Sequence, residues 1–348
     1  MNLEIRIATP TDADAWNTFV RERPMTHHAF AWEWRDILHA SFGHEPRYLV
    51  AVENAIVVGV VPLFLVKSIL FGRALVSVPY LNAGGILTDR HDVASALAQR
   101  LEEEASRERV KYVELRHQES AAAHLPSWAE RSHKVSMILS LAPSSDEMMK
   151  RFSSKLRSQI RRPEKEGATS RIEIDSSSGV DDFYRVFAEN MRDLGTPVYP
   201  KELFRRTIQA FGSRCRTSIV SIAGEPAAAG ITITQGHGAE IPWASSLRRF
   251  NNVSPNMLLY WSAIRAGCEA GEQYFDFGSS SPDSGTYRFK AQWGAEPKAL
   301  HWYYHAAPEN IPDVNPKSAK FAFAVKVWQR LPLPIANLAG PVLTKSLP

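Results

Sequence analysis

The chain alternates between two patterns of apolar positions: runs with a period of two, and positions that recur every three or four residues. The first pattern is typical of buried strands and the second of amphipathic helices. In residues 1–142 they predict a strand, two helices, three strands, a helix and two strands. The predicted elements are, in order, Glu4–Ile7, Thr11–Arg21, Phe30–Ala40, Arg47–Val52, Ile56–Val66, Arg73–Val78, Asp92–Arg109, Lys111–Arg116 and Val135–Leu141.

Residues 143–307 repeat this order after one additional helix. The predicted elements are Asp146–Arg162, Arg171–Asp175, Asp181–Leu194, Pro200–Phe211, Arg216–Ala223, Ala227–Thr234, Ala239–Ser246, Asn256–Ala270, Tyr274–Phe277, Thr286–Trp293 and Ala299–His305. Gly195 and Pro197 are well placed to end the helix before them. A strand, two helices, a three-strand meander, a helix and two strands are the order of a GNAT-type N-acyltransferase domain. We therefore predict an α+β fold of two tandem GNAT-type domains, with mixed sheets flanked by helices, over 1–142 and 143–307.

The tail, residues 308–348, differs in composition from the two predicted domains. A helix is predicted over Lys317–Leu331, with Phe321, Val325 and Trp328 on one face and basic residues, Lys317 and Lys320 among them, elsewhere. This helix could pack back on a domain. The alternative is a peripheral contact with an anionic membrane surface, at the inner face of the cytoplasmic membrane.

Composition and charge limit the class of protein. Apolar residues make up 44% and charged residues 22% of the chain, which is ordinary for a soluble globular protein. Cys215 and Cys268 form no CxxC motif, and the N-terminus lacks the basic-then-apolar order of a signal peptide. A cytoplasmic location is therefore expected. The net charge of +4 permits an anionic substrate, and DNA binding is not expected.

The stretch Phe277–Gly294, FGSSSPDSGTYRFKAQWG, is the strongest candidate for chemistry. A polar loop that contains Asp283 follows a strand and leads into a helix, a common place for a ligand in α/β folds. The helix presents its candidate side chains within two turns: Tyr287, Arg288, Phe289, Lys290 and Trp293. Lys290 could offset negative charge on a reacting oxygen or bind a phosphate. The alternative is a surface lysine, with Phe289 and Trp293 as core anchors.

Two further stretches are candidates for substrate binding. The helix within Ser144–Gly167 has a buried stripe of Met148, Phe152, Leu156 and Ile160, and its flanks carry Arg157 and Arg161. Seven basic and two acidic residues lie between Arg151 and Arg171, which is either an anion site or a solvated face. The stretch Glu189–Pro200 places polar residues at a helix end and in the loop after it, where an acceptor pocket is common: Asn190, Arg192 and Tyr199.

Other chemistries lack their motifs. The sequence contains no HExxH, EF-hand loop, Walker loop or GxSxG, and no metal site is expected. Acetyl-CoA enzymes bind pyrophosphate with a glycine-rich turn before a helix, but here that turn is Leu247–Asn256, LRRFNNVSPN, without glycine. This disfavours coenzyme A without excluding it. No tightly bound cofactor is expected.

Several stretches together resemble the FemAB family, and within it the branch associated with the exosortase (PEP-CTERM) system of exopolysaccharide-making Gram-negative bacteria. They are SFGHEPRYLVAV, VGVVPLFLVKSILFGRALVSVPYLNAGG, KLRSQIRR, NMRDLGTPVYP, YFDFGSSSPDSGTYRFKAQWG and LPLPIANLAGP. The resemblance implies two fused GNAT-type domains and transfer of an aminoacyl or other acyl group to an amine. It assigns charge stabilisation during transfer to Lys290, in the FK motif, and phosphate binding to Arg157 and Arg161.

Two departures from the family pattern bear on the substrate. Some relatives have a lysine in a Trp-x-x-(Val/Ile)-Lys motif, but here Leu38 follows Trp34 and Ile37. The chain also has no room for the long helical arm of some relatives. A peptidoglycan precursor is therefore not the expected acceptor.

Three functions follow from these observations. The first is an N-acyltransferase that uses aminoacyl-tRNA or acyl-CoA as donor and a glycan or peptide precursor of the envelope as acceptor. The second is an acyl-CoA-dependent N-acetyltransferase that acts on an amino sugar. The third is a non-catalytic scaffold in an envelope polysaccharide system.

Overall fold

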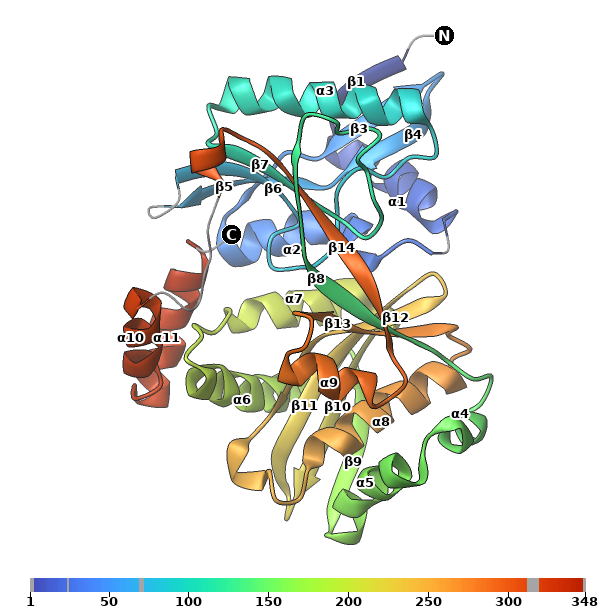
Figure 1. Cartoon of the computed structure of the whole chain (residues 1–348), viewed down its shortest axis with the longest axis vertical. Coiled ribbons are helices and arrows are strands. Elements are labelled where there is room, and N and C mark those ends of the chain that lie inside the picture. Colours follow the sequence, from blue (N-terminus) through green and yellow to red (C-terminus); the bar gives the residue numbers. More distant parts are fainter. Residues whose placement is uncertain (1–2, 24, 69–71, 312–318, 347–348) are drawn as a thin grey trace. The chain divides into compact units, whose positions relative to one another are not determined.

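The computed structural model describes residues 3–23, 25–68, 72–311 and 319–346, without the side chains of 319–323. The chain divides into two compact units (Figure 1). Unit 1 comprises Met1–Val135, Lys298–Val314 and Lys345–Pro348, and unit 2 comprises Ser136–Pro297 and Asn315–Thr344. The predicted domain limits, 1–142 and 143–307 with a tail over 308–348, stay a prediction beside this division.

Among its described residues, unit 1 combines two sets of paired strands with three α-helices. The helices are α1 (Ala13–Arg21), α2 (Glu33–Phe42) and α3 (His91–Glu108). One antiparallel sheet has the order β1-β3-β4, from β1 (Leu3–Ile7), β3 (Leu49–Glu53) and β4 (Ile56–Val61). The other has the order β2-β5-β6-β7-β14, from β2 (Glu45–Pro46), β5 (Leu63–Ser68), β6 (Gly72–Ser77), β7 (Tyr112–His117) and β14 (Glu296–His305).

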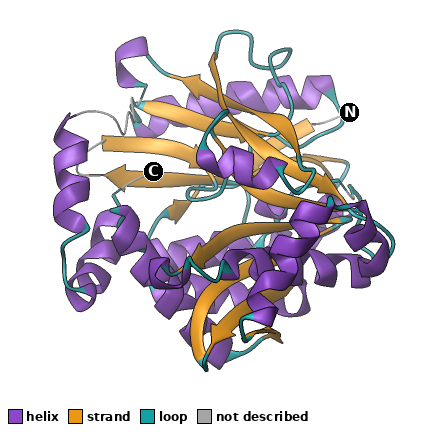
Figure 2. Ribbon diagram, turned by 60° about the horizontal axis from the view of Figure 1, so that its bottom comes forward, coloured by secondary structure: helices purple, strands orange, loops and turns teal. Residues whose placement is uncertain are grey.

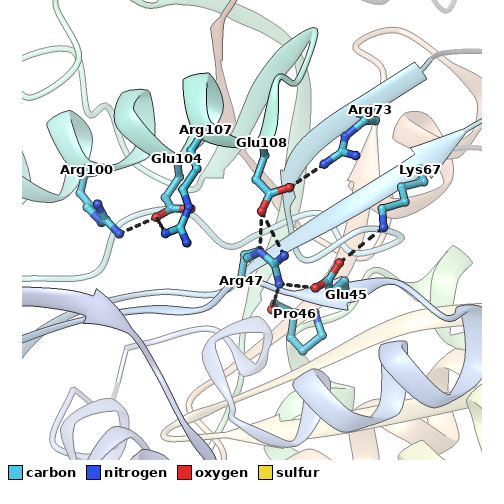
Figure 3. Close-up of polar contacts among 9 residues, drawn as sticks. All are labelled: Glu45, Pro46, Arg47, Lys67, Arg73, Arg100, Glu104, Arg107 and Glu108. Atoms are coloured by element: carbon cyan, nitrogen blue, oxygen red, sulfur yellow. Dashed lines mark hydrogen bonds and ion pairs between the residues drawn. The ribbon is translucent and has the colours of Figure 1, made fainter.

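The core of unit 1 lies between α3 and the strands. Leu97 and Leu101 of α3 pack with apolar residues such as Leu63, Leu75 and Val113, all fully buried. At the rim of this unit a group of ion pairs joins α3 to the strands (Figure 3). Arg47 donates to Glu108 through Nε at 3.3 Å and Nη2 at 3.0 Å, and its Nη1 pairs with Glu45 at 2.6 Å.

In unit 2 the strands β13, β12, β11, β10 and β9 pair side by side in this order. These strands are β9 (Ala168–Ile174), β10 (Cys215–Ile222), β11 (Glu225–Gln235), β12 (Gly238–Ser246) and β13 (Tyr274–Ser280). Only β12 and β13 pair in parallel. Strand β8 (Ala129–Ser140) has residues in both units.

Helices cover the strands of unit 2, as Figure 2 shows in purple against orange. Helix α6 (Ser177–Leu194) and helix α8 (Pro255–Glu269) both pack on β10 and β11, and Figure 1 shows them on opposite sides of these strands. The remaining helices of the unit are α4 (Ser145–Arg151), α5 (Ser154–Lys165), α7 (Lys201–Phe211), α9 (Gly285–Ala291), α10 (Ala319–Trp328) and α11 (Leu333–Thr344). Among the described residues, no helix combines the length and apolar content that crossing a membrane requires.

Most of the predicted elements occur in the predicted order, and several helix ends agree with the prediction. Ser144 is the N-cap of α4 and accepts a hydrogen bond from the N–H of Glu147 at 3.3 Å. Gly195 ends α6 with a φ of 79°, the left-handed conformation that glycine adopts most easily.

Two predictions of a single element were wrong, because the structure has two elements in each place. The strand predicted over Ile56–Val66 is β4 and β5, which belong to different sheets and separate at Pro62, a residue without an N–H for a ladder. The helix predicted over Asp146–Arg162 is α4 and α5. Phe152 between them is extended, and the Ser153 side chain caps α5 by accepting from Leu156 N at 3.2 Å.

The last strand and the tail also differ from prediction. The strand predicted over Ala299–His305 to complete the second half is β14, which pairs antiparallel with β7 of unit 1, His301 opposite His117. Within the tail, the predicted helix is the shorter α10, and its predicted start at Lys317 lies outside the described residues. Helix α11 was not predicted, because Pro334 and Pro341 interrupt the helical pattern.

Candidate active site

Lys290 is placed by a strand end and a short helix. Strand β13 ends at Ser280, and α9 begins at Gly285 after Ser284, whose hydroxyl accepts from Tyr287 N at 3.1 Å. The Lys290 side chain points back to the strand. Its Nζ donates to the carbonyl oxygen of Gly278 at 2.8 Å and to that of Ser279 at 2.9 Å. Only 7% of Lys290 is exposed, so this ammonium group is not the surface lysine of the alternative prediction.

A buried carboxylate fixes the backbone that holds Lys290. The N–H of Gly278 donates to Oδ1 of Asp276 at 2.7 Å, and Gly278 has a φ of 74°. The hydroxyl of Ser136 donates to the same carboxylate, at 2.5 Å to Oδ1 and 2.7 Å to Oδ2. Because a carboxylate that accepts several hydrogen bonds is held rigidly, Asp276 positions the turn whose carbonyl groups bind Lys290.

A second buried carboxylate lies at the same level of the sheet. Glu240 on β12 is the register partner of Asp276 on β13, and these residues form the last of three described pairs between the two strands. Both side chains are buried. A Cβ atom added to Gly278 would lie 3.6 Å from Oε1 of Glu240, so this carboxylate faces the same turn. The opposite charge of Lys290 in this turn fits the rule that buried charges are compensated.

Beyond this pair, the two strands separate. Strand β12 continues to Ser246 and β13 to Ser280, but no described pair joins them after Glu240 and Asp276. Lys290 therefore contacts β13 just where the ladder to β12 has ended. Backbone groups that no longer pair with a neighbouring strand are available to a ligand.

Phe289 and Trp293 belong to an aromatic cluster. The ring of Trp293 lies 5.5 Å from that of Phe152 and 6.2 Å from that of Phe277, and the ring of Phe289 lies 5.1 Å from that of Tyr260. Trp293 is 1% exposed. Trp293 therefore has the core-anchor role of the alternative prediction, whereas Phe289 is half-buried. Their contact with a substrate stays a prediction.

Three other predicted residues of this stretch are at least partly exposed to solvent. Asp283 and Arg288 are exposed and Tyr287 is half-buried. None of these side chains forms a hydrogen bond or ion pair with a described residue. Asp283 has a φ of 62°, a conformation that costs a non-glycine residue about 1 kcal/mol. These groups are available for binding, in contrast to the buried Lys290.

The two arginines predicted to bind substrate, Arg157 and Arg161, lie on α5 and differ in their contacts. Nη1 of Arg157 donates to the carbonyl oxygen of Phe152 at 2.5 Å and so binds the end of α4. Arg161 is exposed, and its guanidinium has no hydrogen-bond or ion-pair partner in the described part of the chain. Met148, Phe152, Leu156 and Ile160 are buried, as predicted. No described contact joins Arg157 or Arg161 to Lys290.

The third predicted group lies at the end of α6. Nδ2 of Asn190 donates to the hydroxyl of Ser245 at 3.0 Å, on the part of β12 beyond its ladder with β13. Arg192 binds Asp193 through Nε at 2.7 Å and the carbonyl oxygen of Leu331 at 3.2 Å. Its guanidinium therefore fastens the tail to α6. The ring of Tyr199 stacks on Phe187 at 6.1 Å.

The turn before α8 is poorly suited to bind a pyrophosphate through its backbone N–H groups. The N–H groups of Phe250, Asn251, Val253 and Ser254 donate to carbonyl groups of the same turn, and so does the N–H group of Met257 in α8. The first residue of α8 is Pro255, which has no N–H. An anion at a helix N-terminus needs free amide groups. Here the backbone gives a structural reason, besides the missing glycines, to disfavour coenzyme A.

The cysteines offer no nucleophile. Cys215 and Cys268 are free and buried, and burial raises the pKa of Cys215 to about 12. A thiol with such a pKa is protonated at neutral pH.

The sequence prediction missed Ser136, Glu240 and Asp276. Glu240 and Asp276 had a signal: each is an acidic residue inside an apolar strand, in AEIPW and YFDFG. Because charged side chains are almost never buried without a partner, such positions indicate a polar cluster. Ser136 had no comparable signal.

Comparison with known proteins supports the fold. Residues 150–291 match the family model described as an acetyltransferase (GNAT) domain. The structure is similar to that of FemX, with 14% identity over 88% of this chain and 98% of that chain and a TM-score of 0.67. It also resembles the C-terminal domain of a protein described as a lysylphosphatidylglycerol synthetase from Agrobacterium fabrum, with 12% identity over 86% and 93% of the two chains and a TM-score of 0.61.

A third similar structure is a tandem GNAT protein of the clavulanic acid biosynthesis pathway. It shares 12% identity with this chain over 90% of this chain and 100% of the other, with a TM-score of 0.55. No curated protein matches the sequence. At these identities the similarities concern the fold. They confirm the predicted α+β architecture of two tandem GNAT-type domains, the second of which contains the matched acetyltransferase region and Lys290.

Proposed function

We propose that this protein transfers an activated acyl or aminoacyl group to an amine of a cell-envelope or exopolysaccharide precursor, and that Lys290 stabilises the charge that develops. The observation that carries the proposal is the buried ammonium group of Lys290, held by two carbonyl oxygens where β12 and β13 separate. A fixed positive charge shielded from water stabilises an oxyanion far better than a solvated one.

The proposed reaction has two steps. The acceptor nitrogen attacks the carbonyl carbon of the donor ester, and the carbonyl oxygen becomes negative near Lys290. The C–O bond of the ester then breaks as the amide forms. The nitrogen loses a proton to Asp283 or to a group of the substrate, and the departing oxygen gains one. Tyr287 and Arg288, with available side chains on α9, would orient the reactants.

The donor that fits best is an aminoacyl ester on tRNA. The turn before α8 uses its amide groups internally, which argues against the pyrophosphate of coenzyme A. Arg161, exposed and without a described partner, is suited to bind a phosphate of the donor or acceptor.

A second function is favoured by one specific observation. The family model that matches residues 150–291 describes acetyltransferases. An acyl-CoA-dependent N-acetyltransferase acting on an amino sugar would use the same ammonium group, with a thiolate as leaving group. The resemblance of YFDFGSSSPDSGTYRFKAQWG to the exosortase-associated FemAB branch supports a cytoplasmic enzyme of exopolysaccharide synthesis as the context of either function.

One experiment separates these candidates. The purified protein is titrated with acetyl-CoA in a calorimeter, and in parallel with aminoacylated and deacylated tRNA. We expect micromolar binding of aminoacyl-tRNA and no binding of acetyl-CoA at millimolar concentration. Micromolar binding of acetyl-CoA would instead establish the second function. Binding of neither donor, with co-purification of polysaccharide-synthesis proteins, would favour a scaffold.

A further inference from the structure

Helix α11 is packed with its small residues inward and its large apolar residues outward. Ala336, Gly340 and Thr344, four residues apart along one face, are buried. On the other side Ile335 is 51%, Leu338 80% and Val342 69% exposed, and their spacing of three and four residues places them in one stripe. A surface helix ordinarily has the reverse arrangement.

The buried face of α11 has no space for larger side chains. A Cβ atom on Gly340 would lie 2.8 Å from the backbone nitrogen and from Cγ1 of Val198, closer than real contacts allow. The helix also packs on α6, and Arg192 of that helix binds the carbonyl oxygen of Leu331 just before α11. The packing requires the small residues, so the exposure of the large ones is built into the fold.

We propose that this stripe, Ile335, Leu338 and Val342, binds the surface of an anionic lipid membrane. Leu343 and, on α10, Val327 add exposed apolar side chains in the same tail. Contiguous apolar surface of this kind marks an interaction site in a soluble domain. The proposal is independent of the proposed transfer reaction.

The charge of the tail favours an anionic membrane as the partner of the stripe. From residue 314 to residue 348 the chain has five basic residues, Lys317, Lys320, Lys326, Arg330 and Lys345, and no acidic residue. Lys326 and Arg330 are exposed. A segment that combines exposed aliphatic side chains with lysine and arginine, and that has no acidic residue, is suited to lie in the headgroup region of an anionic bilayer.

A protein partner fits less well. The cores of protein interfaces are enriched in aromatic residues, whereas the outward stripe of α11 is wholly aliphatic. The basic residues of the tail, without acidic ones, would also repel those of a second copy.

The test is co-sedimentation of the full-length protein with vesicles. One vesicle type is phosphatidylcholine alone, and the other contains 30% phosphatidylglycerol, roughly the anionic share that gives a strong surface potential. We expect binding to the anionic vesicles that weakens at high salt. The double variant Leu338→Asp/Val342→Asp should bind at least about tenfold more weakly, since each change removes an aliphatic group from the bilayer.

Two controls accompany the double variant. Ile174→Asp changes another exposed apolar residue, 53% exposed, on the edge strand β9 and should leave vesicle binding unchanged. Lys326→Glu/Arg330→Glu should reduce binding to anionic vesicles only. Because all changed side chains are exposed, the thermal midpoint of unfolding should move little. If the aspartates disturb folding, the double variant Leu338→Ser/Val342→Ser replaces them in the same test.

Three results would overturn the proposal. The wild-type protein could fail to bind anionic vesicles, or the double variant could bind them as well as wild type. The wild-type protein could also be a dimer in solution that the double variant dissociates, without any vesicle binding. In that case a second copy of the chain would cover the stripe.

Discussion

The ammonium nitrogen of Lys290 lies 2.8 Å from the carbonyl oxygen of Gly278. The N–H of the same glycine donates to Asp276. The carbonyl group of Gly278 therefore binds the lysine, while its amide group binds a buried carboxylate. This arrangement fixes the place of the positive charge before any substrate binds. Preorganised charge of this kind is the most effective form of electrostatic stabilisation, because nothing has to reorient during the reaction.

Replacing Ser136 tests the support of this arrangement. In Ser136→Ala the Asp276 carboxylate loses a donor to both of its oxygens, and we expect the free energy of unfolding to fall by about 1–3 kcal/mol. If Asp276 positions Lys290, turnover should fall more than donor affinity does. Ser262→Ala, at a buried serine on α8 without a partner among the described residues, is the control. Unfolding in urea and separate measurement of kcat and KM check this, and an unchanged kcat would contradict it.

Much of this arrangement is local and could be predicted. The capped helices, the end of α6 at Gly195 and the helix that contains Lys290 all follow from residue types at fixed spacing. The pairing of β14 with β7 could not be predicted, because the partner of a strand depends on contacts distant in sequence. The positioning role of Asp276 was missed for the same reason, since Ser136 lies 140 residues away along the chain.

The break between α4 and α5 and the orientation of α11 show a second limit. Met148, Phe152, Leu156 and Ile160 keep one apolar spacing through the break, so periodicity alone predicts a single helix. In α11 the contact of Gly340 with Val198 decides which face is buried, against the preference of larger apolar residues for the interior. Packing overrides pattern in both cases.

Substituting Gly340 should loosen the tail. In Gly340→Ala the added methyl group would meet the backbone of Val198, so α11 must shift. We expect the thermal midpoint to fall by a few degrees, equivalent to about 1–3 kcal/mol, and the tail to become more sensitive to limited proteolysis. Ala339→Ser, one position earlier and half-buried, should behave as wild type. Equal protease resistance of all three proteins would show that the close contact is unimportant.

Lowering the pH should lower the free energy of unfolding of unit 1, because His117 is buried there. Burial lowers the pKa of this histidine to about 4, and its Nε2 accepts the N–H of Ile86 at 3.4 Å, which requires the neutral ring. The unfolded chain, with a histidine pKa near 6.5, binds the proton more readily, so the free energy of unfolding decreases as pH falls from about 6.5 towards 4.

Between pH 7.5 and pH 5 this difference amounts to about 2 kcal/mol. Urea unfolding at the two pH values measures it in wild type and in His117→Gln, which keeps an acceptor but does not titrate. The variant should lose about 2 kcal/mol less over this interval. His44, whose pKa burial also lowers to about 4, remains in both proteins and contributes equally. An identical pH dependence of the two proteins would contradict the role given to His117.

The ion pairs of Figure 3 should contribute unequally. The Glu108 side chain is 16% exposed and binds both Arg47 and Arg73, whereas Glu45 is 42% exposed. We expect Glu108→Gln to lower the free energy of unfolding by about 1 kcal/mol at low salt, and Glu45→Gln by less than about 0.5 kcal/mol. Repetition in 1 M NaCl should shrink both effects through screening. An equal effect of the two changes would mean that burial does not strengthen these pairs.

We propose above all that the charge of Lys290 stabilises the transition state of group transfer. Lys290→Met keeps much of the length and apolar stem but removes the charge, and Arg265→Met removes an exposed charge from α8 of the same unit as a control. The direct measurement is kcat for transfer of the labelled donor group that the binding experiment identifies, with thermal unfolding to verify the fold. We predict that kcat falls by about 10²-fold or more in a folded Lys290→Met protein, while Arg265→Met retains wild-type turnover. A folded Lys290→Met protein with undiminished kcat would contradict the account.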